Sequence, residues 1–388
     1  MAIFQDKDKN GKILKTKDGR SWYFKVYKKD FEGNNKAYKS KKYLTKKEAV
    51  DEEAVFILKK ENPLHKRFSI IANDYFNNLY KTNKESTAYS CESYYKNHIC
   101  EFFYKKYIDE IDIATLKQWK EYMLKKNLNI KTLNKAYSIL NNIFNYAVQN
   151  YGLSINYVQI LGCFKEKRDK VVQNNDKLKY ITYEQFVKLI ANIDDIMWKT
   201  FFVFLYYTGI RKGEVQALNW NDVDFDNNEI IVNKTLSVKV KKDSKQNYKI
   251  TSTKNNLNRQ IKMSKILKEQ LLLYKNEICK YSDFNNKWFV FGGPRFLPQT
   301  TIDRHKDKYF KLADINTITI HEFRHSHVSL LINEYIKTSK EKNMKIDMAK
   351  FFLMMSDRMG HTVEVMQNTY MHLFPTIQDE IVDLLDNL

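Results

Sequence analysis

The chain has 388 residues, a length that suits two or three domains, and 43% of them are hydrophobic, enough for each domain to bury a core. Its net charge of +20 is spread along the chain in Lys-rich segments, which predicts attraction to a polyanion, with nucleic acid ahead of a membrane surface. The absence of a long apolar run, a CxxC pair or a His/Cys cluster argues against a membrane-spanning helix, a zinc site and a disulfide framework. Charge alone also fits a ribosomal or RNA-modifying protein.

The first segment has the pattern of a small sheet. Asp18 and Gly19 are a strong two-residue hairpin signal, and a second turn follows at residues 32–35. The three strands predicted around these turns are Lys12–Lys17, Ser21–Lys28 and Lys36–Tyr43.

A helix should follow this sheet. Thr45 and Glu48 form a capping box that opens a helix running to about residue 60, with Val50, Ala54 and residue 57 or 58 on its buried face. The segment is basic, so the sheet could lie in a DNA groove, where Lys25, Lys39 and Lys41 would contact the DNA. An ordinary solvated surface explains the same lysines equally well.

A proline at residue 63 ends this helix and marks a domain boundary. The next hundred residues read as helices, with inward stripes that begin at Phe68 and, after Asp112, at Leu116. The clearest helix is Lys131–Tyr151, which Gly152 should cap. Residues 165–177 are charged and polar, as expected of an extended linker between domains.

The third region opens with a capping box at Thr182 and Gln185, followed by an apolar run that ends at Thr208-Gly209-Ile210-Arg211. A new helix should start near Arg211. Strands are expected at residues 229–236, 249–253 and 259–263, with Lys254 in the turn between the last two. A lysine in such a turn is usually just solvated.

Several polar residues then occur in an order that suggests chemistry on a phosphate. His321 and Arg324 lie one helical turn apart, and His361 precedes Tyr370 by nine residues. Arginines donate bidentate hydrogen bonds to phosphate oxygens, histidines add further hydrogen bonds, and a lysine can protonate a leaving oxygen. Such a set can stabilise a pentavalent phosphorus without a metal, and no carboxylate cluster of the two-metal type is present, so we expect neither metal nor cofactor.

At these residues the chain resembles the tyrosine recombinase family, in particular the integrases of phages and conjugative transposons. The matching motifs are residues 208–214, 321–331 and 360–373. The resemblance implies that Tyr370 attacks the scissile phosphate, with Glu214 supporting Arg211. The other residues that would surround the phosphate are Arg211, Lys254, His321, Arg324 and His361. His325 and His327 match positions that look structural, and Lys249 and Arg259 share the hairpin of Lys254.

The resemblance covers essentially the whole chain and implies a multidomain α+β fold. Its parts would be a three-stranded sheet with a helix that binds arm sites (1–62), an all-helical core-site domain (63–164), the linker, and a mainly helical catalytic domain with a small antiparallel sheet (178–388). The implied activity is site-specific recombination through a 3′-phosphotyrosyl intermediate, which integrates and excises a mobile element. Implied partners are double-stranded DNA, a homo-tetramer on that DNA, an excisionase and a host DNA-bending factor, with no membrane and a cytoplasmic, nucleoid-associated location.

Three points remain open at this level. A type IB topoisomerase would use similar residues, and a catalytically silent DNA-binding protein could share the fold. The segment between Leu331 and Gly360 looks longer than is usual in the family, which leaves its helices uncertain. The last residues, 373–388, are acidic with an apolar helical stripe, so we expect a tail helix that docks on its own domain or on a neighbouring subunit.

Overall fold

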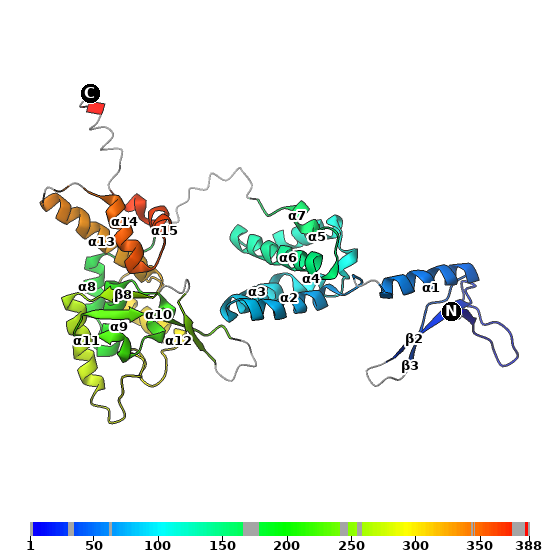
Figure 1. Cartoon of the computed structure of the whole chain (residues 1–388), viewed down its shortest axis with the longest axis horizontal. Coiled ribbons are helices and arrows are strands. Elements are labelled where there is room, and N and C mark those ends of the chain that lie inside the picture. Colours follow the sequence, from blue (N-terminus) through cyan, green and yellow to red (C-terminus); the bar gives the residue numbers. More distant parts are fainter. Residues whose placement is uncertain are drawn as a thin grey trace. The chain divides into compact units, whose positions relative to one another are not determined.

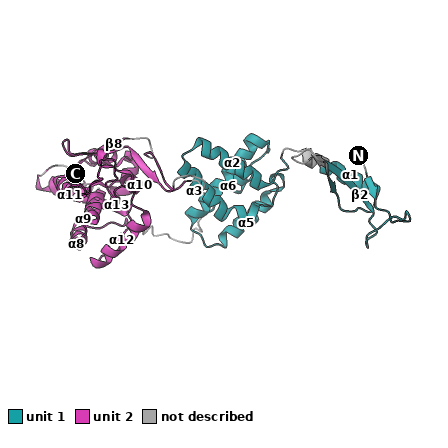
Figure 2. Cartoon of the chain, turned by 90° about the horizontal axis from the view of Figure 1, so that it is seen from below, with its two compact units in different colours: residues 1–169 teal, residues 170–388 magenta. Residues whose placement is uncertain are grey.

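The chain divides into two compact units, residues 1–169 and 170–388 (Figures 1 and 2). The computed structural model describes residues 3–29, 35–61, 64–165, 178–240, 247–253, 258–342, 344, 346–374 and 385–386. Helices dominate and the sheets are small and antiparallel, which confirms the predicted fold class. The linker after residue 165, the turn at 32–34, Lys254 and nearly all of the tail lie outside the described residues. No helix in the described parts is long and apolar enough to cross a membrane.

The N-terminal sheet has three strands, as expected, but its first strand lies elsewhere in the chain. The strands are β1 (Ile3–Gln5), β2 (Trp22–Lys29) and β3 (Asn35–Lys39), antiparallel in that order. The predicted strand Lys12–Lys17 is wrong: Ile3 pairs with Phe24 in its place. The residues before Gly19 instead form the turn that Asp18 and Gly19 indicate, closed by Gly19 N–H donating to Thr16 O at 2.9 Å.

Helix α1 (Lys46–Glu61) covers one face of this sheet. The predicted capping box is present, since Glu48 N–H donates to Thr45 Oγ1 at 3.1 Å and Thr45 N–H donates to Glu48. The predicted inward face is wrong, because Val50 is exposed, whereas Ala49 is buried and Phe56 stacks on Tyr38 with ring centroids 4.8 Å apart. The phase of a helix this short depends on the sheet below it, which the sequence pattern does not contain.

The helical part of the first unit has one continuous core. The predicted helix up to Phe103 is interrupted at Ile99, and the other predicted helices are confirmed, with Asp112 and Gly152 as caps. Its helices are α2 (Phe68–Thr82), α3 (Glu85–His98), α4 (Cys100–Phe103), the 3₁₀ turn η1 (Ile108–Glu110), α5 (Ile113–Leu124), α6 (Ile130–Tyr151) and α7 (Tyr157–Leu161).

The second unit is built around α9 (Ile196–Thr208), which is buried on nearly all sides and contacts α8 (Tyr183–Ala191), α11 (Lys265–Ile278) and α13 (Glu322–Glu341). The expected strand 229–236 is two strands in different sheets: β5 (Glu229–Val232) lies beside β4 (Val223–Asp224) and β8 (Arg259–Lys262), and β6 (Lys234–Ser237) lies beside β7 (Lys249–Ser252). The other elements in the first part of the second unit are α10 (Lys212–Ala217) and the 3₁₀ turn η2 (Trp220–Asp222).

The remaining helices bring the C-terminal motifs back to the end of α9. They are α11 (Lys265–Ile278), α12 (Gln299–Leu312), α13 (Glu322–Glu341), α14 (Met348–Met359), α15 (Val363–Tyr370) and the 3₁₀ turn η3 (Met371–Leu373). In its described residues, the long segment before Gly360 contains the last turns of α13 and the whole of α14. Val328 and Ile332 of α13 share a small core with Phe352 and Met366 of the last two helices.

Candidate active site

Arg211 is held where α9 ends and α10 begins. Gly209 caps α9 with a left-handed backbone, φ 60°, so the chain turns and Arg211 stands directly before α10. Its guanidinium donates from Nη1 to Glu214 at 3.0 Å and from Nη2 to the carbonyl oxygen of Gly360 at 2.7 Å. The side chain remains 23% exposed, so it can still reach a ligand.

Glu214 lies between two arginines, Arg211 and Arg259, and the sequence motifs do not predict the second contact. Arg259 of β8 donates from Nη1 and Nη2 to the two carboxylate oxygens of Glu214, at 3.1 and 2.6 Å. Burial would raise the pKa of Glu214, but Arg259 and then Arg211 lower it below its usual value. Arg259 was visible in the sequence only as a neighbour of Lys254, and its contact with Glu214 depends on the pairing of β8 with β5.

Arg324 is the most deeply buried of these cations, with 1% of its surface exposed. Its Nη1 donates to the carbonyl oxygen of Gly209 at 2.8 Å and its Nη2 donates to that of Met359. Burial, with the nearby charges of Arg211 and Arg259, lowers the pKa of Arg324 to about 9, which still leaves it cationic at neutral pH. Its Nε is buried without a hydrogen-bond partner among the described residues, so a donor is left for an incoming acceptor.

Both predicted histidines lie beside these arginines. Burial, followed by the charges of Arg324 and Arg211, lowers the pKa of His321, and the same causes lower the pKa of His361 to about 3. The two rings are therefore neutral near pH 7 and each can donate one hydrogen bond. Nδ1 of His361 is buried with no partner in the described part of the chain.

Tyr370 ends α15 and is buried, with 1% of its surface exposed. Burial raises the pKa of its phenol to about 12, and the charge of Arg324 partly opposes this. Its hydroxyl oxygen lies 2.7 Å from Nδ1 of His325, a residue that the sequence motif predicts to be structural. The position of His325, one residue after Arg324, was visible in the sequence, but its contact with Tyr370 was not.

Arg358 fastens together four of the elements that carry these residues. It donates to the carbonyl oxygens of Lys262 and Tyr207 at 3.3 and 3.0 Å, and its Nε donates to Nε2 of His327 at 3.1 Å. The other nitrogen of that ring, Nδ1, donates to Tyr206 O at 2.8 Å. Both nitrogens of His327 are therefore engaged within the protein.

The structure thus brings together Arg211, Glu214, His321, Arg324, His361 and Tyr370, and adds Arg259 and His325. Lys254 lies outside the described residues. Within the described parts, no group of three or more His, Cys, Asp or Glu side chains is placed to hold a metal ion.

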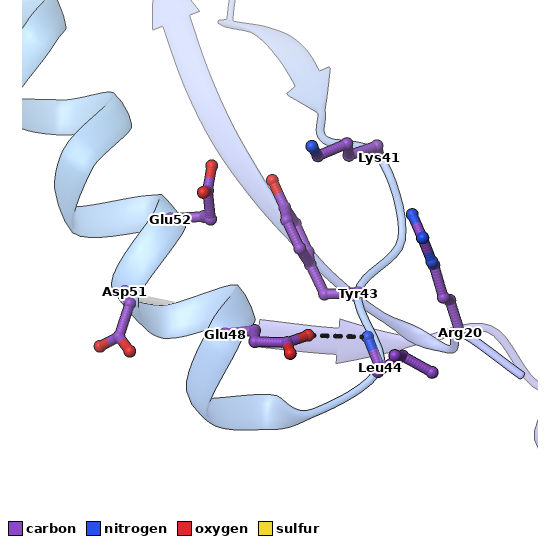
Figure 3. A pocket seen from close by; sticks show the side chains of 7 residues that line it. All are labelled: Arg20, Lys41, Tyr43, Leu44, Glu48, Asp51 and Glu52. Atoms are coloured by element: carbon purple, nitrogen blue, oxygen red, sulfur yellow. Dashed lines mark hydrogen bonds between the residues drawn. The ribbon is translucent and has the colours of Figure 1, made fainter.

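The three lysines proposed for the N-terminal sheet do not share one surface. Lys25 and Lys39 are cross-strand partners, and both lie over the ring of Tyr23, with Nζ 5.9 and 4.0 Å from its centroid. Lys39 also forms an ion pair with Asp6 at 2.9 Å. Lys41 instead lines a surface pocket with Arg20 and with carboxylates of α1 (Figure 3). The full lining is Arg20, Lys41, Tyr43, Leu44, Glu48, Asp51 and Glu52.

Comparison with known sequences gives one consistent family. Residues 179–344 match the family described as "Phage integrase family", and residues 67–167 match the "Phage integrase SAM-like domain". The ICEBs1 integrase of Bacillus subtilis (strain 168) is 29% identical over 322 residues, which is 77% of this chain and 80% of that protein.

Solved structures agree in fold. The Tn1549 transposon integrase in complex with transposon right end DNA aligns with a TM-score of 0.59 at 19% identity, covering 81% of this chain and 98% of that one. A lambda integrase tetramer bound to a Holliday junction aligns with a TM-score of 0.52 at 13% identity, covering 90% and 95% of the two chains.

Proposed function

The chain is a site-specific DNA recombinase of the tyrosine recombinase family, an integrase of a mobile element, and on this premise we propose that Tyr370 is the residue that attacks the DNA. The observation that carries the proposal is the gathering of Arg211, Arg324, His321 and His361 near one buried tyrosine. Two fixed cations and two neutral imidazoles supply the donors that a phosphorane with five oxygens requires.

Arg211 and Arg324 bind the non-bridging oxygens of the scissile phosphate, and His321 and His361 add hydrogen bonds to them. The oxygen of Tyr370 attacks phosphorus and the 5′-oxygen leaves, which forms a 3′-phosphotyrosyl bond. Lys254 protonates the leaving oxygen. The bond energy stays in the intermediate, so a 5′-hydroxyl of a partner strand can reverse the step without ATP.

The remaining parts of the chain position DNA. The helical domain, residues 63–164, binds core sites beside the crossover, and the N-terminal domain, residues 1–62, binds separate arm sites. Phe24 and Tyr38, which directly precede Lys25 and Lys39, contact Phe56 of α1. Successive side chains of a strand point to opposite faces, so both lysines lie on the face of the sheet opposite α1, and this supports the second assignment. The protein acts as a homo-tetramer on double-stranded DNA, as the lambda integrase tetramer on a Holliday junction suggests. An excisionase and a host DNA-bending factor set the direction of the reaction, and the protein associates with the nucleoid.

A nicked suicide substrate tests the assignment of Tyr370. The fragment beyond the nick diffuses away after cleavage, so a covalent protein–DNA adduct accumulates and can be counted on a denaturing gel. We expect the wild-type chain to form the adduct and Tyr370→Phe to form none, while both bind core-site DNA with similar affinity. An adduct formed by Tyr370→Phe would show that another residue is the nucleophile.

A further inference from the structure

The hydroxyl group of Tyr370 has a specific partner that the reaction described above does not use. Nδ1 of His325 lies 2.7 Å from this oxygen, within hydrogen-bond distance. The ring of His321 meets the ring of His325 nearly at right angles, with centroids 5.1 Å apart. Three rings therefore stand in sequence, from His321 through His325 to Tyr370.

We propose that His325 is a catalytic residue that accepts the proton of Tyr370 during cleavage and returns it during rejoining. This inference rests on the proposed role of Tyr370 as nucleophile. General base catalysis needs an acceptor within hydrogen-bond reach of the proton, and the contact meets that condition.

The protonation states fit this direction of transfer. Burial, followed by the neighbouring His321 and Arg324, lowers the pKa of His325 to about 4, and Glu322 only partly opposes this, so the ring is neutral. Since the phenol of Tyr370 is also neutral near pH 7, its hydroxyl donates to an unprotonated Nδ1, and Nε2 of His325 carries the ring hydrogen.

Two other acceptors in the described part of the site, His327 and Glu214, are engaged elsewhere. His327 donates from Nδ1 to Tyr206 and accepts at Nε2 from Arg358, so it has no free lone pair. The carboxylate of Glu214 is occupied by two arginines. Bulk water has little access to a tyrosine that is 1% exposed.

In the proposed step one bond to phosphorus forms, another breaks, and one proton is transferred. The oxygen of Tyr370 forms a bond to phosphorus, the bond from phosphorus to the 5′-oxygen breaks, and the phenolic proton moves to Nδ1 of His325. The leaving oxygen takes its proton from a different donor, Lys254 in the proposed mechanism. Because the pKa values of the phenol and the imidazole are far apart, the proton moves as the new bond forms rather than before it. In rejoining, the imidazolium returns the proton to the departing phenol.

The rate of adduct formation on the nicked suicide substrate tests this role in full-length protein. We expect His325→Ala and His325→Gln to lower the single-turnover rate by about 10²-fold or more, the usual contribution of a general base. The glutamine variant keeps a hydrogen-bond acceptor and guards against misfolding of the alanine variant. The matched control is His372→Ala, an exposed histidine two residues after the nucleophile. A glutamine variant with the wild-type rate would mean that His325 only positions the ring, and would overturn the proposal.

Two further measurements separate base from acid. A substrate with sulfur in place of the bridging 5′-oxygen has a leaving group that needs no proton, so the defect of His325→Ala should persist on it. Full rescue by this substrate would show His325 to be the acid for the leaving group, and overturn the proposal. The rate of adduct formation by the alanine variant should also rise about tenfold for each unit of increase in pH, because hydroxide replaces the missing base. If the wild-type chain forms no adduct, the proposed function fails; if it does and His325→Ala equals it, only this inference fails.

Discussion

Glu214 and Arg259 form a buried bidentate ion pair, with side chains 2% and 5% exposed. Arg211 donates to the same carboxylate, and Arg259 also donates from Nε to the carbonyl oxygen of Arg358 at 3.0 Å. One carboxylate therefore joins the start of α10 to β8, and through Arg259 to the end of α14. It neutralises part of the charge that Arg211, Arg259 and Arg324 bring to one small volume.

Removal of Glu214 should therefore cost more than removal of a surface charge. Glu214→Ala leaves two arginines without their counter-ion, and we expect a loss of about 3–5 kcal/mol in the free energy of unfolding. Glu229→Ala is the control, since its partner Lys262 is 70% exposed and such pairs contribute about 1 kcal/mol or less. Urea denaturation of the second unit's transition measures both. Equal losses would mean that Glu214 acts as an ordinary surface carboxylate.

Arg211 and Arg324, the two arginines proposed to bind the scissile phosphate, should respond differently to substitution. Arg211→Ala should slow adduct formation by about 10²- to 10³-fold with a modest change in stability, because the side chain is partly exposed. Arg324→Ala should show the same loss of rate and also lower the unfolding midpoint, because it removes hydrogen bonds to Gly209 and Met359. Cleavage within a few-fold of wild type in Arg211→Ala would contradict its role at the phosphate.

The N-terminal sheet should contribute a separable, salt-dependent term to DNA binding. For binding to arm-site DNA, Lys25→Ala and Lys39→Ala should each reduce the slope of the logarithm of the binding constant against the logarithm of the salt concentration by about one. Lys47→Ala, an exposed lysine of α1, is the matched control. Deletion of residues 1–62 should abolish arm-site binding and preserve core-site cleavage. Unchanged binding of every fragment by the truncated chain would rule out a two-site protein.

Acid should destabilise the second unit through its buried histidines. The pKa of His325 is about 4 and those of His327 and His361 about 3, below the ordinary value of 6.5, so the unfolded chain binds protons first as pH falls. Stability should hold above pH 6.5 and decline between about 6.5 and 3, by up to about 1.4 kcal/mol per pH unit for each histidine. His327→Gln should remove one proton from this slope in unfolding titrations. An identical unfolding midpoint at pH 7 and pH 5 would refute the argument.

The tail after Leu373 should couple subunits rather than contact DNA, because it is acidic in a basic protein. Truncation after Leu373 should weaken the tetramer on DNA and disturb the control of cleavage, while a monomer still binds one half-site. Native gel shifts on half-site and full-site DNA measure this. If the truncated chain assembles and recombines like the full chain, the tail does not couple subunits and instead docks on its own domain.

Sequence patterns that depend only on residues close together in the chain, such as helix caps, predicted the secondary structure well. The caps at Asp112 and Thr182 are present, and so is the long helix that ends at Gly152, because each depends on neighbours along the chain. The first strand was placed wrongly because the pairing of Ile3 with Phe24 outweighs a local hairpin signal.

The residues of the site also fall into those that short motifs reveal and those that only the tertiary structure reveals. The motifs of Arg211, Arg324 and Tyr370 could be recognised because each is a short run of sequence. The contacts of Arg259 with Glu214 and of His325 with Tyr370 depend on which strand pairs with which and on where α15 returns to α13. Residue spacing carries no information about either.

Arg324 and Arg211 both donate a hydrogen bond to a glycine carbonyl oxygen, Arg324 to Gly209 and Arg211 to Gly360. Every amino acid has such an oxygen, so no substitution can delete the anchor itself. Both glycines have φ 60°, a backbone angle that other residues rarely adopt. A Cβ at residue 209 would also lie 2.8 Å from the His327 ring and 2.9 Å from Met359, whereas a Cβ at residue 360 would lie 3.4 Å from its nearest neighbour, Arg259. Mutational tolerance is therefore governed by backbone angle at both positions and also by volume at residue 209, where a single methyl group should inactivate the enzyme without altering any functional group in it.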